Sequence, residues 1–309
     1  MRQEGLERPA RMPSTAPQIF DRRLLVRRRD RVAARAAHHD FLLARVADDF
    51  AERLSLVQRT FSAGLNIDAH HGLLSRRLRA LPNVTAITDA DPSAAMRALC
   101  DGPTLDADEE ALPLASGSID LAVSGLSLQL TNDLPGALIQ LRRALRPDGL
   151  LLAALLGAET LRELRQAWLI AEEDLTGGAS PRVAPFADVR AMGSLLQRAG
   201  FALPVVDTDT VTVTYPSPLA LMSEIKAMGA SNMLTDRRRV PVTRTLLMRA
   251  AQVYQDRFGL PDGRIPATFE IITLTAWVPH ESQPKPLRPG SATTRLATAL
   301  GVNEGRLKQ

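Results

Sequence analysis

Cysteine and aromatic residues are scarce in this chain of 309 residues. Cys100 is the only cysteine, which excludes a disulfide within the chain and a metal site built from several cysteines, and is consistent with a reducing compartment. No segment reaches the roughly 20 consecutive apolar residues that span a bilayer, and the longest apolar run, residues 150–158, suits a buried strand. Because 45% of the residues are hydrophobic, the chain can bury a large core. The sequence therefore predicts a soluble globular protein.

Acidic residues are scarce in the N-terminal segment. Residues 1–35 contain ten arginines and four acidic residues, a charge of +6, so the rest of the chain carries −2 of the total of +4. Such a segment is compatible with a mitochondrial transit peptide, a nucleic-acid-binding arm or a solvated helix. It lacks the apolar core of a secretory signal, and no aromatic residues alternate with its arginines. We therefore predict no nucleic-acid partner.

The composition along the chain divides it into four segments. Residues 1–18 are predicted to be a flexible leader, and residues 281–309 an extended tail rich in proline. Residues 19–60 have the apolar spacing of two helices, which should pack on the following domain and close one side of its pocket. Residues 61–280 form the main domain, which includes a helical insertion at about 217–260.

The main domain is organised around residues 65–91, which have the pattern of a strand, a loop, a helix and a second strand. The loop ends at Gly72, and the second strand ends at Asp91. This pattern is typical of the first half of a nucleotide-binding βαβ unit, in which the loop and helix N-terminus hold anionic groups and the acid accepts hydrogen bonds from ribose hydroxyls. An ordinary α/β crossover without a ligand remains the alternative, because a loop with few glycines is a weak signal.

Further strands are predicted downstream, most of them separated by helices. They cover residues 103–107, 119–124, 150–156, 205–215 and 267–278. Five strands that alternate with helices predict an α/β fold with a parallel sheet, and the two late strands are expected to form an antiparallel pair.

Several motifs in this domain resemble those of class I S-adenosylmethionine-dependent methyltransferases. They are Asp91-Pro92-Ser93 with Met96, Asp108 with Leu112-Pro113, Ile119-Asp120-Leu121, and residues 145–150 with the strand that follows. The resemblance implies a Rossmann-like fold, a seven-stranded and mostly parallel sheet with helices on both faces, and S-adenosyl-L-methionine as cosubstrate. The residues that it places around the cosubstrate are Asn66, Asp68, Ala69, His70, Gly72, Asp91, Pro92, Asp108, Glu109 and Ser124.

Additional motifs beyond this core narrow the resemblance to one branch. They lie at residues 157–165, 181–186, 206–209, 215–216, 228–232, 266–271 and 290–293. Together they are similar to the methyltransferase-like arginine hydroxylase that acts as an assembly factor of respiratory complex I. The resemblance covers roughly residues 19–300. It implies a core subunit of complex I as partner, peripheral association with a membrane, and a location in the bacterial cytoplasm or, in a eukaryote, the mitochondrial matrix.

The first methyltransferase motif departs from the family pattern. Asn66 stands where the family has an acid, Asp68 where it has glycine, and His70 and His71 fill the loop before Gly72. A side chain at Asp68 obstructs close backbone approach to a ligand and adds negative charge near the cosubstrate carboxylate. Alternatively, Asp68 pairs with the cosubstrate ammonium group. The departure predicts weak or absent cosubstrate affinity.

The sequence therefore predicts a methyltransferase that acts on a protein partner. Methyl transfer depends largely on positioning, and the sequence displays no catalytic residue, no metal site and no indication of oligomeric state. A second hypothesis is an assembly chaperone or arginine hydroxylase for a complex I subunit, with a degenerate cosubstrate site. A third is a methyltransferase for a small molecule.

Overall fold

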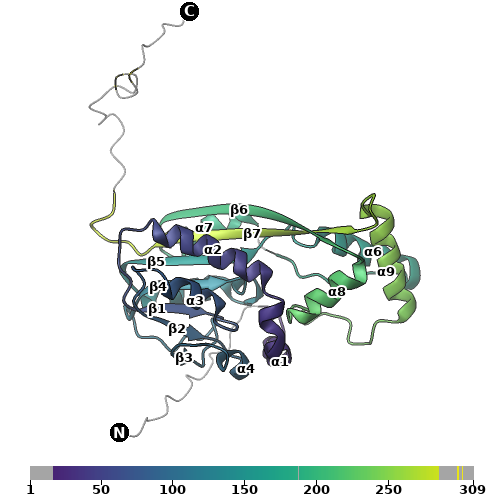
Figure 1. The fold of residues 1–309 in the computed structure, drawn as a ribbon, viewed down its shortest axis with the longest axis horizontal. Coiled ribbons are helices and arrows are strands. Elements are labelled where there is room, and N and C mark those ends of the chain that lie inside the picture. The colour runs from purple at the N-terminus through teal and green to yellow at the C-terminus, as the bar shows by residue number, and fades with distance from the viewer. Residues whose placement is uncertain (1–16, 187, 285–297, 299–300, 302–309) are drawn as a thin grey trace, which may run out of the picture. The chain divides into compact units, whose positions relative to one another are not determined.

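The computed structural model describes residues 17–186, 188–284, 298 and 301. Its centre is a seven-stranded sheet in the order β3-β2-β1-β4-β5-β7-β6 (Figure 1). The strands are β1 Gly64–Ile67, β2 Ile87–Ala90, β3 Thr104–Leu105, β4 Ile119–Gly125, β5 Leu145–Leu156, β6 Ala202–Tyr215 and β7 Ile265–Trp277. The first five strands are parallel, and β7 runs antiparallel to both β5 and β6. This confirms the predicted Rossmann-like sheet with a late antiparallel pair.

Helices connect the strands and cover the sheet. They are α1 Arg22–Val32, α2 Phe41–Ser55, α3 Leu73–Arg79, α4 Ala94–Arg97, α5 Leu134–Ala144, α6 Arg162–Thr176, α7 Val189–Arg198, α8 Pro218–Ala227 and α9 Arg244–Phe258, with 3-10 turns η1 Ala33–His38 and η2 Leu128–Leu130. The helix after β2 begins at Ser93, whose hydroxyl accepts a hydrogen bond from the Met96 amide at 3.2 Å. Helix α4 ends at Arg97, and Leu99 beyond it is 40% exposed.

Two hydrophobic cores lie on the two faces of the sheet. Side chains of α2, α3, α6 and α9 pack on one face, and those of α5 and α7 on the other. Strand β5 contributes to both, since Leu150 and Leu152 belong to the first core and Leu151 and Ala153 to the second. A strand covered on both faces explains the continuous apolar run in the sequence.

The segment between the last two strands contains helices α8 and α9, as the predicted insertion requires. In Figure 1 these helices lie toward the end of the long β6–β7 pair, beside α6. The Tyr254 hydroxyl of α9 donates a hydrogen bond to the Pro266 carbonyl at 2.8 Å and is fully buried. No helix in the described part of the chain is long and apolar enough to cross a membrane.

Helix α2, the second of the N-terminal helices, is built into the first core. Phe50 of α2 is fully buried, and α2 packs directly on α3. The predicted leader and tail lie largely outside the described residues, so the division into four segments stays a prediction. The contacts of Phe50 allow a test of one part of this division, namely that residues 19–60 pack on the main domain.

We expect Phe50→Ala to destabilise the whole protein by about 3–5 kcal/mol, because it leaves a cavity in the first core. Urea unfolding followed by circular dichroism measures the change. Leu56→Ala is the matched control, since Leu56 borders the same helix but is 78% exposed, and it should stay within about 0.5 kcal/mol of the unmodified protein. An equally small effect of Phe50→Ala would show that residues 19–60 are an appendage.

Candidate functional site

The loop after β1 keeps a left-handed backbone at three of its five residues. Asp68, His70 and Gly72 have φ angles of 54°, 52° and 74°. Only Gly72 is glycine, and a Cβ there would lie 3.2 Å from Cα and Sγ of Cys100. A non-glycine residue in this conformation costs about 1–2 kcal/mol. The loop therefore has backbone angles that glycine favours, with two added side chains.

Asp91 joins this loop to the end of β2. Its carboxylate accepts hydrogen bonds from the backbone amides of His70 at 3.0 Å and Ser93 at 2.8 Å. Asp91 is fully buried, and burial raises its pKa to about 6 against the attraction of Arg29. The register places the carboxyl ends of β1, β2 and β4 together, since Ile67 pairs with both Ala90 and Ser124. The acid thus lies where open α/β sheets bind ligands.

Arg29 of α1 contacts both Asp68 and Asp91 and is only 3% exposed. Its Nη1 lies 2.8 Å from Asp68 Oδ1 and 3.3 Å from Asp91 Oδ2, and its Nη2 donates to Asp68 Oδ2 at 3.2 Å. Burial alone would raise the pKa of Asp68, but the Arg29 and Arg22 guanidiniums lower it to about 2. Burial together with Arg29 lowers the pKa of His70 to about 3, so His70 is neutral.

A second arginine of α1 meets the loop after β3. Arg22 Nη2 lies 2.6 Å from Glu109 Oε1 and 3.3 Å from Asp108 Oδ1, and Nη1 donates to the Leu130 carbonyl at 3.0 Å. Glu109 Oε1 also accepts from the Thr131 hydroxyl at 3.2 Å, whereas its Oε2 has no hydrogen-bond partner among the described residues. Burial and the charge of Asp68 raise the pKa of Glu109 to about 8.

We call Asp68, Asp91, Asp108 and Glu109 the acidic cluster. Two arginines face these four carboxyl groups, so with all four ionised the cluster holds two uncompensated negative charges. Burial and, after it, the negative charge of Asp68 raise the pKa of Glu109, and its Oε2 has no hydrogen-bond partner among the described residues. The cluster therefore fits an additional cationic or hydrogen-bond-donating group.

Other residues predicted to bind the cosubstrate have partners within the fold. The Asn66 amide nitrogen donates to Asp89 Oδ1 and the Ser75 hydroxyl, both at 2.9 Å. The Ser124 hydroxyl lies 2.9 Å from that of Ser127 at the end of β4. Ala69 and Pro92 lie beside Asp68 and Asp91 in the two loops, and cosubstrate contact by Asn66, Ser124, Ala69 and Pro92 stays a prediction.

Sequence reasoning missed Arg22 and Arg29, although they share the buried face of α1 with Leu25 and Val32.

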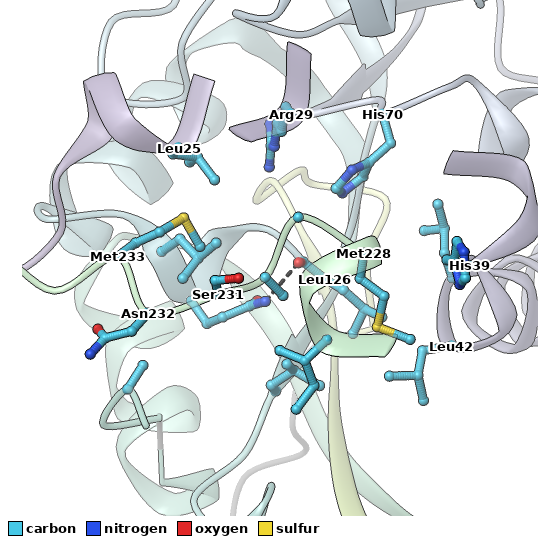
Figure 2. A pocket seen from close by; sticks show the side chains of 18 of the residues that line it. Leu25, Arg29, His39, Leu42, His70, Leu126, Met228, Ser231, Asn232 and Met233 are labelled. Atoms are coloured by element: carbon cyan, nitrogen blue, oxygen red, sulfur yellow. Dashed lines mark hydrogen bonds between the residues drawn. The ribbon is translucent and has the colours of Figure 1, made fainter. Parts of the chain in front are cut away.

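A cavity of about 210 Å³ adjoins the acidic cluster. Its walls are mostly apolar and come from α1, α2, the end of β4 and residues 225–233, with Arg29 and His70 at one side (Figure 2). Arg182 lines another part, where it stacks 4.5 Å from the Trp168 ring centroid and pairs with Glu172. Within residues 17–186 and 188–284, no three histidine, cysteine or acidic side chains are arranged so that they could bind one metal ion. The N-terminal helices close this cavity, as predicted.

Known proteins are similar to this chain in both sequence and fold. Residues 65–153 match the methyltransferase domain family. The mitochondrial arginine hydroxylase NDUFAF5 of Danio rerio is 36% identical over 285 residues, covering 90% of this chain and 88% of its own, and that of Mus musculus is 38% identical over 94% and 87%. The chain belongs to the NDUFAF5 family.

The NDUFAF5-family chain is also similar to methyltransferases. The malonyl-[acyl-carrier protein] O-methyltransferase of Laribacter hongkongensis is 37% identical over 266 residues, covering 81% of this chain and 87% of its own. The YcgJ protein of Bacillus subtilis shares the fold with a TM-score of 0.52 at 14% identity, over 76% of this chain and 99% of its own. The chain is thus a class I methyltransferase-family protein, and the methyltransferase domain supports S-adenosylmethionine as its cosubstrate.

Because the pKa of Glu109 is raised, we expect the stability of the folded protein to depend on pH. Between about pH 4.5 and 8 the unfolded chain has Glu109 ionised while the folded chain keeps it protonated. The folded state then binds more protons, so stability falls as the pH rises through this window. In Glu109→Gln, the free energy of unfolding, measured with urea, should decrease less between pH 5 and pH 8 than in the unmodified protein. Exposed Glu52→Gln is the control and should keep the original slope; an unchanged slope in Glu109→Gln contradicts the assignment.

Proposed function

We propose that this protein is an S-adenosylmethionine-dependent methyltransferase that acts on a protein partner. The observation that carries the proposal is the acidic cluster, in which four carboxyl groups, three of them buried, gather beside an apolar cavity at the ends of β1, β2 and β3. The loop of residues 68–72 and Asp91 hold the amino acid and ribose parts of the cosubstrate. Asp108 and Glu109 hold the adenosine end, and the acceptor group enters the cavity.

The chain contributes to this reaction mainly by binding and orientation. When bound, S-adenosylmethionine supplies an electrophilic methyl group. The apolar walls formed by Leu25, Leu42, Leu126 and Met228 exclude water from the acceptor, and the neutral ring of His70 adds a polar group without adding charge (Figure 2). Placing an acceptor in line at about 3 Å accounts for much of the rate gain in such a site.

The partner that we propose is a core subunit of respiratory complex I. It is supported by the similarity to NDUFAF5 over 90% of the chain and by a cavity large enough for a side chain. The proposed location follows the partner: the cytoplasmic face of a bacterial membrane, or the mitochondrial matrix in a eukaryote. Similarity to malonyl-[acyl-carrier protein] O-methyltransferases makes a small acyl acceptor the alternative substrate.

A second candidate function is assembly without methyl transfer, as a chaperone or an arginine hydroxylase for the same partner. It is favoured by the ion pairs of Arg29 with Asp68 and Asp91, which engage two of the carboxylates that the cosubstrate would use. It is also favoured by the side chains of Asp68 and His70 in a loop that glycine suits. The two candidates differ in whether nucleoside binding is needed.

Binding of S-adenosylhomocysteine, followed by calorimetry, tests the methyltransferase proposal. Asp91→Asn should weaken binding by about 1–3 kcal/mol, because a charge-assisted hydrogen bond becomes a neutral one. Asp101→Asn is the control and should bind normally, since Asp101 lies outside the cluster, is 63% exposed and pairs with Arg76. Absence of heat at millimolar ligand with the unmodified protein would contradict the proposal.

Complex I assembly separates the two candidates in cells. Deleting the gene should remove the assembled complex from a native gel if the partner assignment is right. The methyltransferase proposal expects that Asp91→Ala does not restore assembly, whereas a chaperone that needs no cosubstrate would be restored. An intact, active complex in the deletion strain would eliminate the complex I partner altogether.

A further inference from the structure

The outer face of helix α1 carries a row of arginines. Arg23, Arg27 and Arg31 follow one another at intervals of four residues, and Arg35 in the turn η1 continues the spacing. Residues four apart lie on one face of a helix, about 6 Å from one to the next along its axis. All four are exposed, and none makes an ion pair or a side-chain hydrogen bond with another described residue. We call these four residues the arginine row.

Acidic residues near the arginine row do not neutralise it. Asp21 pairs with Arg237 at 3.1 Å, and Asp30 accepts a hydrogen bond at 2.5 Å from the hydroxyl that caps α4. Burial and, after it, the charges of Arg237 and Arg31 lower the pKa of the neighbouring Arg28. Like charges four residues apart destabilise a helix, so the arginine row does not serve the fold.

The arginine row lies across α1 from the cavity. Leu25 and Arg29 of α1 line the cavity (Figure 2), and Arg27 stands two residues from each, about 200° around the helix. The helix is fixed in this orientation, because Arg28 donates to the Asn232 carbonyl of the cavity wall at 2.8 Å. A helix with its side chains is about 10 Å across, so a chain with one residue in the cavity can reach the arginine row with residues a few positions away.

We propose that the arginine row binds an acidic segment of the protein partner while a nearby residue of the same partner occupies the cavity. This inference rests on the proposed function and adds the chemistry by which the partner is selected. Alternate side chains of an extended segment point the same way and recur about every 6.6 Å, close to the spacing of about 6 Å between the arginines. An extended segment with acidic residues at alternate positions therefore matches the row, and each guanidinium can bind a carboxylate through two hydrogen bonds.

A bilayer and a nucleic acid match this face less well. No large apolar side chain between residues 22 and 38 is exposed, whereas a helix that lies on a bilayer inserts such side chains. The exposed large hydrophobic residues in the described part of the chain include no aromatic side chain on which the bases of a single strand could stack. The arginine row thus offers charge pairing at a regular spacing, which an acidic peptide can satisfy by itself.

Fluorescence anisotropy with two labelled peptides tests the inference. One peptide, about ten residues long, alternates glutamate with serine, and the other has the same composition with its glutamates contiguous. The unmodified protein should bind the alternating peptide more tightly, and added salt should weaken this binding. The triple variant Arg23→Gln/Arg27→Gln/Arg31→Gln should lower the affinity for the alternating peptide by about 3- to 100-fold, the range expected when three exposed charge pairs are lost.

The control is Arg143→Gln/Arg190→Gln/Arg198→Gln, which removes three exposed arginines of α5 and α7 and changes the net charge equally. It should keep the full affinity, and thermal melting establishes that both variants are folded. An equal loss of affinity in the control, or equal binding of the two peptides by the unmodified protein, overturns the inference. So does tighter binding of an oligothymidylate of similar length, or of phosphatidylglycerol vesicles, than of the alternating peptide.

Calorimetry with S-adenosylhomocysteine separates this inference from the proposed function. Both triple variants should bind S-adenosylhomocysteine as the unmodified protein does, because the substituted side chains point away from the acidic cluster. A protein that binds S-adenosylhomocysteine but not the alternating peptide overturns the inference alone. A protein that does not bind S-adenosylhomocysteine overturns the proposed function, whatever the peptides do.

Discussion

The ion pairs between α1 and the acidic cluster are the constraint on which the rest of the site depends. Four carboxyl groups gather where the strands end, and a buried carboxylate is tolerated only with a counterion, a hydrogen bond or a proton. Arg22 and Arg29 supply the counterions, and the backbone amides of His70 and Ser93 supply hydrogen bonds. The N-terminal helices are therefore part of the binding site as well as a cover over the sheet.

The sheet brings these groups together because parallel strands end at one edge. Asp68, Asp91 and Asp108 follow β1, β2 and β3, which are neighbours in the sheet although the residues are up to 40 positions apart in sequence. The order of strands also places the cavity beside them, between α1, α2 and the segment after α8. An acceptor in this cavity would meet the cosubstrate at the boundary between charged and apolar surroundings, where fixed charges act strongly.

Local patterns made most of the fold predictable from the sequence. The strand at residues 205–215, the apolar run at residues 150–156 and the helical spacing of residues 19–60 each depend on neighbouring residues, and each is present in the structure. The counterions were not predictable in this way. Arg29 pairs with residues 39 and 62 positions away, and it lies in an arginine-rich segment that was compatible with a transit peptide, a nucleic-acid-binding arm or a solvated helix. The signal that was available is its spacing of four residues from Leu25, on the buried face of α1.

The position of these arginines in the chain also has a consequence for how the protein folds. Helix α1 precedes the sheet in the chain, and the carboxylates that neutralise its buried face come from residues 68 to 109. Until those residues are in place, Arg22 and Arg29 have no partners that would offset removal from water, so α1 stays hydrated while the sheet assembles. We therefore expect α1 to dock late in folding, after the carboxylates that neutralise its arginines are in place.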